Sequence, residues 1–248
     1  MLKRQYDKTD LPGLAGRSPI AEIFPFRTVM PALYIAGCNL RCLYCLNCRL
    51  VLKECPTLDA YELAMREKNA LEPWLMISGA EPLMNPKTPN LLYLLKTLGF
   101  NVAVATNGTY YEELKSVVED GLVDHVAIDV KAPLELERYV EISPAGITSE
   151  SLARIRASIE FMKNYPLKLV TSCHFRTTVC GKYIDFNDLE LIAEHLGGDA
   201  TYVLQYYTTH QTLDPQLADD NYVVSYETLV DWASRIEGRV KNIFVSEV

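Results

Sequence analysis

The sequence contains no long hydrophobic run and no cluster of basic residues. None of its apolar segments approaches the roughly 18 consecutive residues that a membrane-spanning helix requires, so we expect no membrane span. Lys and Arg are scattered along the 248 residues, and the formal net charge is −8. Proteins that bind nucleic acids usually carry a basic face, so this charge distribution speaks against a nucleic-acid partner.

The N-terminus also lacks the pattern of a secretory signal, because no apolar segment follows the charged residues Lys3 and Arg4. We therefore expect a cytoplasmic protein. The number of cysteines, seven, is odd. Reduced thiols fit an odd number in a chain without an export signal better than a disulfide framework does.

Short apolar segments typical of buried strands alternate with helical patterns through most of the chain. Near-continuous apolar runs such as Val102–Ala105 are what a parallel sheet covered on both faces requires. The predicted strands are Ala32–Ala36, Trp74–Ser78, Val102–Thr106, His125–Val130, Lys168–Arg176 and Tyr202–Tyr206, with a seventh candidate at Asn242–Glu247.

The helices between these strands have recognisable first residues. Thr109 and Glu112 have the spacing of a capping box, and so do Asn187 and Glu190. Ser225 has the position of an N-cap for the last helix. Each of these signals predicts that a helix begins there.

Repeated strand–helix units with short connections predict right-handed crossovers and a parallel sheet. The predicted fold class is α/β, an open, partial (β/α)6 TIM-like barrel with parallel strands. We expect a single domain over residues 1–248, with an N-terminal extension (1–31), a core barrel (32–207) and a C-terminal helix and strand (208–248). In such barrels the functional residues lie at the carboxyl ends of the strands.

Three cysteines, Cys38, Cys42 and Cys45, follow the first predicted strand of the barrel with the spacing C-x3-C-x2-C. Thiolates at this spacing on one loop can bind three irons of a [4Fe–4S] cluster, which normally has four Cys ligands. One iron is then open for a substrate or cofactor. The alternative is a structural zinc site that includes Cys48, although zinc usually takes two Cys pairs from separated segments.

The cysteine spacing, with the aromatic Tyr44 just before the third cysteine, resembles the radical S-adenosylmethionine superfamily. The resemblance implies that Cys38, Cys42 and Cys45 bind a [4Fe–4S] cluster. It also implies that the open iron chelates the amino and carboxylate groups of S-adenosylmethionine, and that Tyr44 contacts this cofactor.

The second predicted strand of the barrel ends in Ser-Gly-Ala-Glu-Pro (78–82), which resembles the Gly-Gly-Glu-Pro motif of that superfamily. The resemblance implies that Gly79, Ala80 and Glu81 hold the amino end of S-adenosylmethionine. Ala80 departs from the second glycine of the motif. If this position requires a positive φ, Ala costs on the order of 1 kcal/mol there.

Later strand ends carry further polar residues, among them Asn107 in Thr-Asn-Gly and both Asp129 and Lys131 in Asp-Val-Lys. These strings, and the Arg-Thr-Thr-Val run that begins at Arg176, resemble glycyl-radical activating enzymes such as the pyruvate formate-lyase and anaerobic ribonucleotide reductase activators. The resemblance implies cofactor contacts for all four residues, and for Gln205 at the end of the sixth strand. A surface ion pair is the alternative for Asp129 and Lys131.

Four other residues near these strand ends have simpler interpretations. Cys48 and Cys173 are interpreted as small buried side chains, and His174 as a core histidine. A reactive role for Cys180 lacks a supporting base nearby in the sequence.

The resemblance implies reductive cleavage of S-adenosylmethionine to a 5′-deoxyadenosyl radical that abstracts a hydrogen atom, chemistry that belongs to the cofactor. A compact chain with an open barrel favours a large substrate, so the expected partner is a glycyl-radical enzyme that is activated at a backbone glycine. The expected electron donor is a low-potential protein such as flavodoxin or ferredoxin. Two alternatives are open: a small-molecule enzyme similar to 7-carboxy-7-deazaguanine synthase, and a non-catalytic metal-binding module.

Two long stretches, 132–148 and 208–222, follow strand ends and show little helical periodicity. Loops longer than about 12 residues in compact domains are usually functional or disordered. We therefore expect these two stretches to frame the opening for the glycine loop of the partner.

Overall fold

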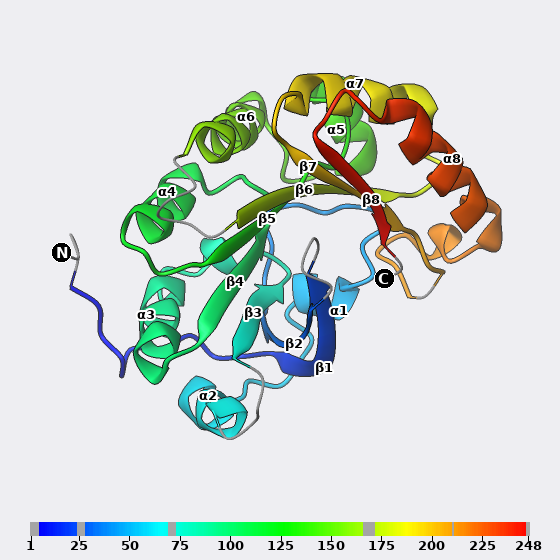
Figure 1. Ribbon diagram of the computed structural model, residues 1–248. Helices are drawn as coiled ribbons and strands as arrows, with labels where there is room; N and C mark the ends of the chain where they lie inside the picture. Colours follow the sequence, from blue (N-terminus) through cyan, green and yellow to red (C-terminus); the bar gives the residue numbers. More distant parts are fainter. Residues whose placement is uncertain (1–4, 24–27, 69–72, 166–171, 210, 247–248) are drawn as a thin grey trace.

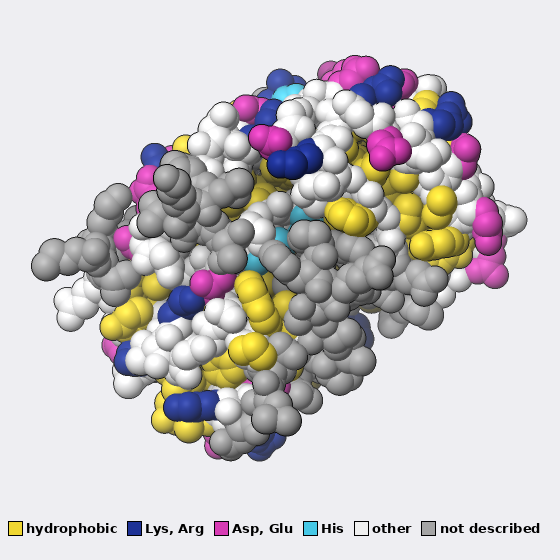
Figure 2. Space-filling model, in the orientation of Figure 1, with side chains coloured by type: hydrophobic (Ala, Val, Ile, Leu, Met, Phe, Trp, Pro, Cys, Tyr) yellow, Lys and Arg dark blue, Asp and Glu magenta, His cyan; other side chains and the backbone are white. Residues whose placement is uncertain are grey.

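The computed structural model of the protein describes residues 5–23, 28–68, 73–165, 172–209 and 211–246. No helix within these ranges is long and apolar enough to cross a membrane. Among the side chains drawn in colour in Figure 2, acidic and basic residues are intermixed over the visible face.

The centre of the structure is one eight-stranded sheet whose strand order follows the chain from β1 to β8 (Figure 1). Strands β2 to β8 are parallel, and β1 pairs antiparallel with β2 at one edge. The strands are β1 (Gly16–Ile23), β2 (Thr28–Ile35), β3 (Trp74–Gly79), β4 (Asn101–Thr106), β5 (His125–Asp129), β6 (Ser172–Val179), β7 (Thr201–Tyr206) and β8 (Asn242–Ser246). The predicted α/β class with an open, parallel barrel is confirmed.

Most helices lie on the outer, convex side of the curved sheet (Figure 1). The α-helices are α1 (Cys48–Val51), α2 (Ala60–Lys68), α3 (Thr88–Leu98), α4 (Tyr111–Glu119), α5 (Leu136–Ile142), α6 (Ser149–Asn164), α7 (Phe186–Leu196) and α8 (Tyr226–Ile236). Three short 3-10 helices are η1 (Pro82–Met84), η2 (Pro215–Leu217) and η3 (Asp220–Tyr222).

The two faces of the sheet carry side chains of different size, because successive residues of a strand point to opposite faces. On β3, Leu75 and Ile77 belong to the large core between sheet and helices. A smaller, separate cluster contains Met30, Ala32, Met76, Ala103, Ala105 and Ala127. Four of these six residues are alanines, so this side of the sheet leaves room for a ligand.

Strand β1 lies within the predicted N-terminal extension, and its pairing with β2 changes register between Ser18 and Ala21. Pro19 lies inside this irregularity, at the edge of the sheet, which is where a proline without an N–H is tolerated. Two ends of predicted strands, residues 168–171 and Glu247, lie outside the described residues.

Two of the predicted helix starts are wrong, that of α4 by one residue and that of α7 by two. Helix α4 begins after Tyr110 with no side-chain cap, and the Thr109 hydroxyl bonds elsewhere. The capping box of α7 is formed by Asp185 and Asp188 rather than by Asn187 and Glu190. The N-cap at the start of α8 is Ser225, as predicted.

The stretch 132–148 is not an irregular loop, because it contains α5, on which Tyr139 and Ile142 are buried. The stretch 208–222, of which residue 210 is not described, contains η2 and η3. In it, Leu217 is buried and its carbonyl accepts a hydrogen bond from the Tyr207 hydroxyl at 2.6 Å. Each stretch therefore has buried side chains among its described residues.

Candidate functional site

A cavity of about 640 Å³ lies at the carboxyl ends of the parallel strands. Its lining brings together residues of the cysteine loop and of strand ends from β2 to β8. They include Tyr34, Cys38, Leu40, Cys42, Tyr44, Cys45, Met76, Ser78, Ala80, Asn107, Asp129, Lys131, Arg176, Thr178, Gln205 and Ser246. Ten of the twelve residues predicted for the site therefore line one cavity, and the other two, Gly79 and Glu81, adjoin it in the sequence.

The cysteine loop (residues 38–45) is held by the two stretches that were predicted to frame an opening. Leu43 donates its N–H to the Ile142 carbonyl at 2.9 Å, and its own carbonyl accepts the Asp214 N–H at 2.9 Å. The Arg41 N–H donates to the Ser143 hydroxyl at 2.7 Å. These stretches support the cysteine loop from both sides, so shortening either one would disturb the loop itself.

The thiols of Cys38, Cys42 and Cys45 are mostly buried, and burial is the largest cause of their raised pKa values. The pKa of Cys38 rises to about 12, and that of Cys45 to about 11. The positive charge of Lys131 acts in the opposite direction on all three thiols. The site therefore favours further positive charge, such as that of a metal centre, if the three sulfurs are to be thiolates.

A single metal ion does not fit the arrangement of these side chains. Within the described ranges, no three or more His, Cys, Asp or Glu side chains gather closely enough to hold one ion. A four-coordinate zinc site would require such a group. Cys48, the additional ligand of the zinc alternative, does not line the cavity, and its Sγ lies 3.8 Å from the Gln211 carbonyl.

Tyr44 lines the cavity together with the three cysteines and the charged residues. Its ring packs against those of Tyr183 and Tyr207, with ring centroids 6.2 Å apart in both pairs. In the described part of the chain, its hydroxyl is the one buried side-chain oxygen or nitrogen without a hydrogen-bond partner. Buried polar groups are usually paired, so this oxygen indicates that the cavity receives a polar ligand.

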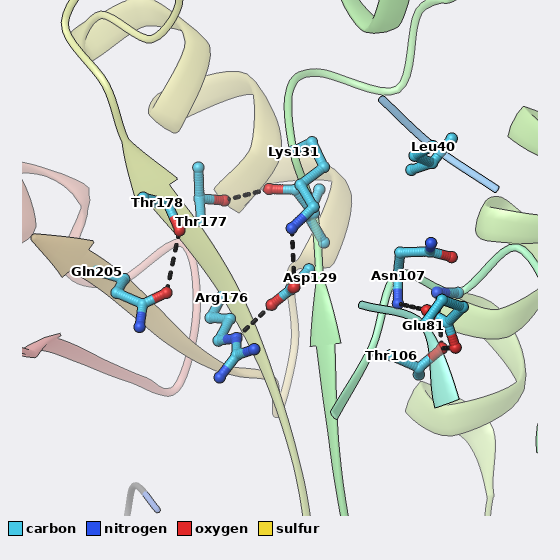
Figure 3. A network of polar contacts seen from close by, with 12 residues as sticks. Leu40, Glu81, Thr106, Asn107, Asp129, Lys131, Arg176, Thr177, Thr178 and Gln205 are labelled. Carbon is cyan, nitrogen blue, oxygen red and sulfur yellow. Dashed lines mark hydrogen bonds and ion pairs between the residues drawn. The ribbon is translucent and has the colours of Figure 1, made fainter. Parts of the chain in front are cut away.

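Asp129, Lys131 and Arg176 form a charged group on one wall of the cavity (Figure 3). The carboxylate of Asp129 accepts from Lys131 Nζ at 2.8 Å and from Arg176 Nε. Burial alone would raise the pKa of Asp129, but the charges of Arg176 and Lys131 outweigh it and hold this pKa well below its usual range. With two cations and one anion, the group has a net charge of about +1 and favours a negatively charged group of a ligand, such as a carboxylate.

The Gly79–Glu81 segment brings the end of β3 close to the start of the cysteine loop. Gly79 has a φ of +129°, and a Cβ at this position would lie 2.3 Å from the Ile35 carbonyl oxygen, so only glycine fits. Ala80 has no positive φ, since Lys53 is the one non-glycine residue with a positive φ among those described. The departure from the second glycine of the motif therefore causes no backbone strain.

Glu81 is buried and does not line the cavity. Its carboxylate accepts the Asn107 N–H at 2.7 Å, the Thr106 hydroxyl at 2.8 Å and the Leu83 N–H at 3.0 Å (Figure 3). Burial raises its pKa to about 7, although these three donors act in the opposite direction. The Glu81 N–H donates to the Gly37 carbonyl at 2.9 Å, so this residue joins the ends of β3 and β4 to the cysteine loop.

Gln205 lies on the opposite side of the cavity from Glu81 and Asn107 (Figure 3). Its Oε1 accepts the Thr178 hydroxyl at 3.0 Å, which leaves the amide N–H groups to act as donors. Thr178 was not predicted as a site residue, although its place in the Arg-Thr-Thr-Val run, two residues after Arg176, puts both side chains on the same strand face.

Asn39, within the cysteine loop, was also missed, and so were Thr109 and Ser143, because their contacts join the loop to segments far away in the sequence. The Thr109 hydroxyl lies 3.2 Å from Asn39 Oδ1, across 70 residues of sequence. His174, predicted as a core histidine, is buried and lies 2.8 Å from His125, ring nitrogen to ring nitrogen. Neither histidine lines the cavity.

Comparison with known proteins gives one family and several relatives. The model of the Radical SAM superfamily matches residues 33–196, which is more than half of the chain. Two proteins of Methanocaldococcus jannaschii, both named "putative glycyl-radical enzyme activating enzyme", are 28% and 26% identical to this chain. The alignments cover 74% and 76% of this chain, and 75% and 71% of the relatives.

Among solved structures, SuiB of Streptococcus suis with bound S-adenosylmethionine is similar, with a TM-score of 0.61 at 13% identity. The match covers 87% of this chain and 51% of SuiB, and at this identity it supports the fold alone. Three thiols in the cavity lining, an unpaired Tyr44 hydroxyl and a net positive charged group suit an iron–sulfur cluster and an organic cofactor that carries a carboxylate.

Proposed function

The chain belongs to the radical SAM superfamily, whose enzymes use a [4Fe–4S] cluster and S-adenosylmethionine, and we propose that it activates a glycyl-radical enzyme. In this proposal, Cys38, Cys42 and Cys45 hold the cluster. The observation that carries the assignment is the convergence of these three thiols with Asp129, Lys131 and Arg176 around one cavity. The bound pair of cofactors would supply the radical that removes a hydrogen atom from the substrate.

The residues of the chain bind and orient the cofactor and keep water away from it. The net positive group of Asp129, Lys131 and Arg176 attracts the carboxylate of S-adenosylmethionine. The Tyr44 hydroxyl is free to form a hydrogen bond with the ligand, and the Gln205 amide offers donors on the far wall. Because Tyr44 and Cys42 are buried, the inner part of the cavity is shielded from solvent.

Gly79, Ala80 and Glu81 act on the cofactor through the backbone in this proposal. The Glu81 carboxylate is already satisfied by three protein donors, so it positions the strand end rather than the ligand. Ala80 lines the cavity and can present its backbone to the amino end of S-adenosylmethionine.

The substrate assignment rests on the names of the two Methanocaldococcus relatives and on the strings Thr106–Gly108 and Arg176–Val179. A partner enzyme would present a glycine on an extended loop to the cavity, and a low-potential protein such as flavodoxin or ferredoxin would supply the electron.

The experiment is anaerobic reconstitution of the protein with iron and sulfide, followed by reduction in the presence of S-adenosylmethionine. We expect release of 5′-deoxyadenosine and methionine, and a glycyl radical detected by electron paramagnetic resonance when a cognate partner enzyme is added. The small-molecule alternative would be supported if the protein cleaved S-adenosylmethionine while turning over a small heterocycle and formed no radical on any glycyl-radical enzyme offered. No iron binding at all would overturn the assignment of the site.

A further inference from the structure

The side chain of Asn107 contacts the cysteine loop. Its Nδ2 donates to Asn39 Oδ1 at 3.1 Å and lies 3.7 Å from Cys38 Sγ, within hydrogen-bonding distance of sulfur. Its Oδ1 accepts both the N–H of Thr109 at 2.9 Å and the Thr109 hydroxyl at 2.6 Å. Asn107 is 5% exposed, so water competes little for these bonds.

The orientation of this amide is fixed by its neighbours. Because Oδ1 takes two donors from Thr109, the N–H groups of Nδ2 are the ones that face Asn39 and Cys38. The backbone of Asn107 is held as well, by the bond from its N–H to the buried Glu81 carboxylate. Figure 3 shows Asn107 above Glu81, on the side of the cavity where Leu40 lies.

Cys38 Sγ therefore has two N–H groups directed at it. The second is the backbone N–H of Leu40, at 3.3 Å. Hydrogen bonds to the sulfurs of an iron–sulfur cluster are one of the determinants of its reduction potential, because they stabilise negative charge on sulfur. The reduced cluster carries one more negative charge than the oxidised cluster, so such donors favour reduction.

We propose that Asn107 is a positioning residue that acts on the cluster through Cys38: it locks the cysteine loop by way of Asn39 and raises the reduction potential of the cluster. This inference rests on the proposed cluster ligands. It assigns Asn107 to the sulfur side of the site rather than to S-adenosylmethionine. The bond from Nδ2 to Asn39 accounts for the loop contact, and the approach of Nδ2 to Cys38 accounts for the effect on the potential.

The test is a redox titration of the reconstituted cluster without S-adenosylmethionine, monitored by electron paramagnetic resonance. The variants are Asn107→Ala, which removes the donor, and Asn107→Asp, which keeps the shape and adds a negative charge beside the thiolate. The matched control is Thr106→Val, which removes the bond to Glu81 Oε1 but no donor to sulfur. We expect the potential to become more negative in Asn107→Ala, more so in Asn107→Asp, and to be unchanged in Thr106→Val.

A second measurement needs no stable variant. In wild-type protein labelled with 15N-asparagine, pulsed electron paramagnetic resonance of the reduced cluster should detect a weak coupling to nitrogen and to an exchangeable proton. The inference would be overturned if the wild-type cluster lacked this coupling. It would also be overturned if the reduction potential were unchanged in both Asn107 variants, or shifted equally in Thr106→Val. None of these outcomes would affect the proposed function. A wild-type chain that binds no cluster would overturn both.

Discussion

Asp129 on β5 and Arg176 on β6 are paired positions of neighbouring parallel strands, and their side chains form an ion pair inside the cavity. Lys131, two residues further along the chain, bonds the other oxygen of the same carboxylate. One anion therefore holds two cations in place. Neither a surface ion pair nor three independent cofactor contacts describes this arrangement, because each side chain depends on the others for its position.

We expect Asp129→Asn to reduce both the stability of the protein and its affinity for S-adenosylmethionine. The substitution leaves Arg176 and Lys131 close together without their anion. We expect a loss of roughly 1–3 kcal/mol in the free energy of unfolding. The loss is smaller than for a fully buried pair because the Asp129 side chain is 18% exposed. Binding should weaken by roughly 1–3 kcal/mol, as for a lost hydrogen bond to a charged group.

The control for this variant is Asp124→Asn, because Asp124 pairs with Lys96 at 2.6 Å outside the cavity. It should lower the melting temperature and leave the affinity for S-adenosylmethionine, measured by calorimetry, unchanged. If Asp129→Asn bound S-adenosylmethionine with wild-type affinity, the charged group would contribute to folding and not to cofactor binding.

We expect Cys48→Ala to retain the iron–sulfur cluster and Cys38→Ala to lose it. Cys48 is buried, lies outside the cavity lining and faces the Gln211 carbonyl, so the change removes a small side chain and no ligand. Iron content per chain and the visible absorption band measure the outcome after anaerobic reconstitution. If both variants lost the cluster equally, Cys48 would be a fourth ligand and no iron would be open.

The positions of the strands and of the cavity could be predicted because both follow from local patterns. Each parallel strand is a short apolar run, and parallel strands place their carboxyl ends at one edge. The charged pair Asp129 and Lys131 was recognisable for the same reason, since residues two apart on a strand share a face. The cysteine spacing identified the loop that follows β2.

The support of the cysteine loop could not be predicted, because it depends on contacts between distant segments. Thr109 has the local pattern of a helix cap, but in the structure its hydroxyl bonds Asn107 and lies near Asn39. Glu81 has the position of a cofactor ligand in the motif, but Thr106 at the end of β4 and Asn107 just after it satisfy its carboxylate. Both residues form hydrogen bonds with segments far away in the sequence, which the local sequence does not reveal.

We expect His125 to make the protein less stable as the pH falls below about 6.5. Burial, and then the charge of Arg176, lower the pKa of His125 to about 3, so the folded protein holds this ring neutral. In the unfolded chain the ring binds a proton near its ordinary pKa of about 6.5. Between these two values the unfolded state binds more protons, so stability is present above pH 6.5 and decreases with falling pH.

Because of His125, the free energy of unfolding should fall by roughly 1–2 kcal/mol between pH 7 and pH 5. Urea denaturation at the two pH values, compared between wild type and His125→Asn, measures it. The variant should lose less stability over this interval than wild type does. An equal loss in both proteins would show that His125 is not the group that titrates.

The last prediction concerns Gly146, which lies directly against the cysteine loop. A Cβ at Gly146 would be 1.8 Å from the Asn39 carbonyl oxygen, and its φ is +94°. Gly238 has nearly the same φ, +95°, but a Cβ there would meet no atom within 4 Å. The two glycines therefore share the backbone strain of an alanine substitution, about 1–2 kcal/mol, and differ in the contact with the loop.

We expect Gly146→Ala to displace the cysteine loop and lower the iron content after reconstitution, because the clash is with backbone that cannot rotate away. Gly238→Ala should lower the melting temperature slightly and bind iron as wild type does. Iron content per chain and thermal denaturation of both variants separate the two effects. Normal iron content in Gly146→Ala would show that the loop tolerates movement at Asn39, and that the contact from the 132–148 stretch is not needed to form the site.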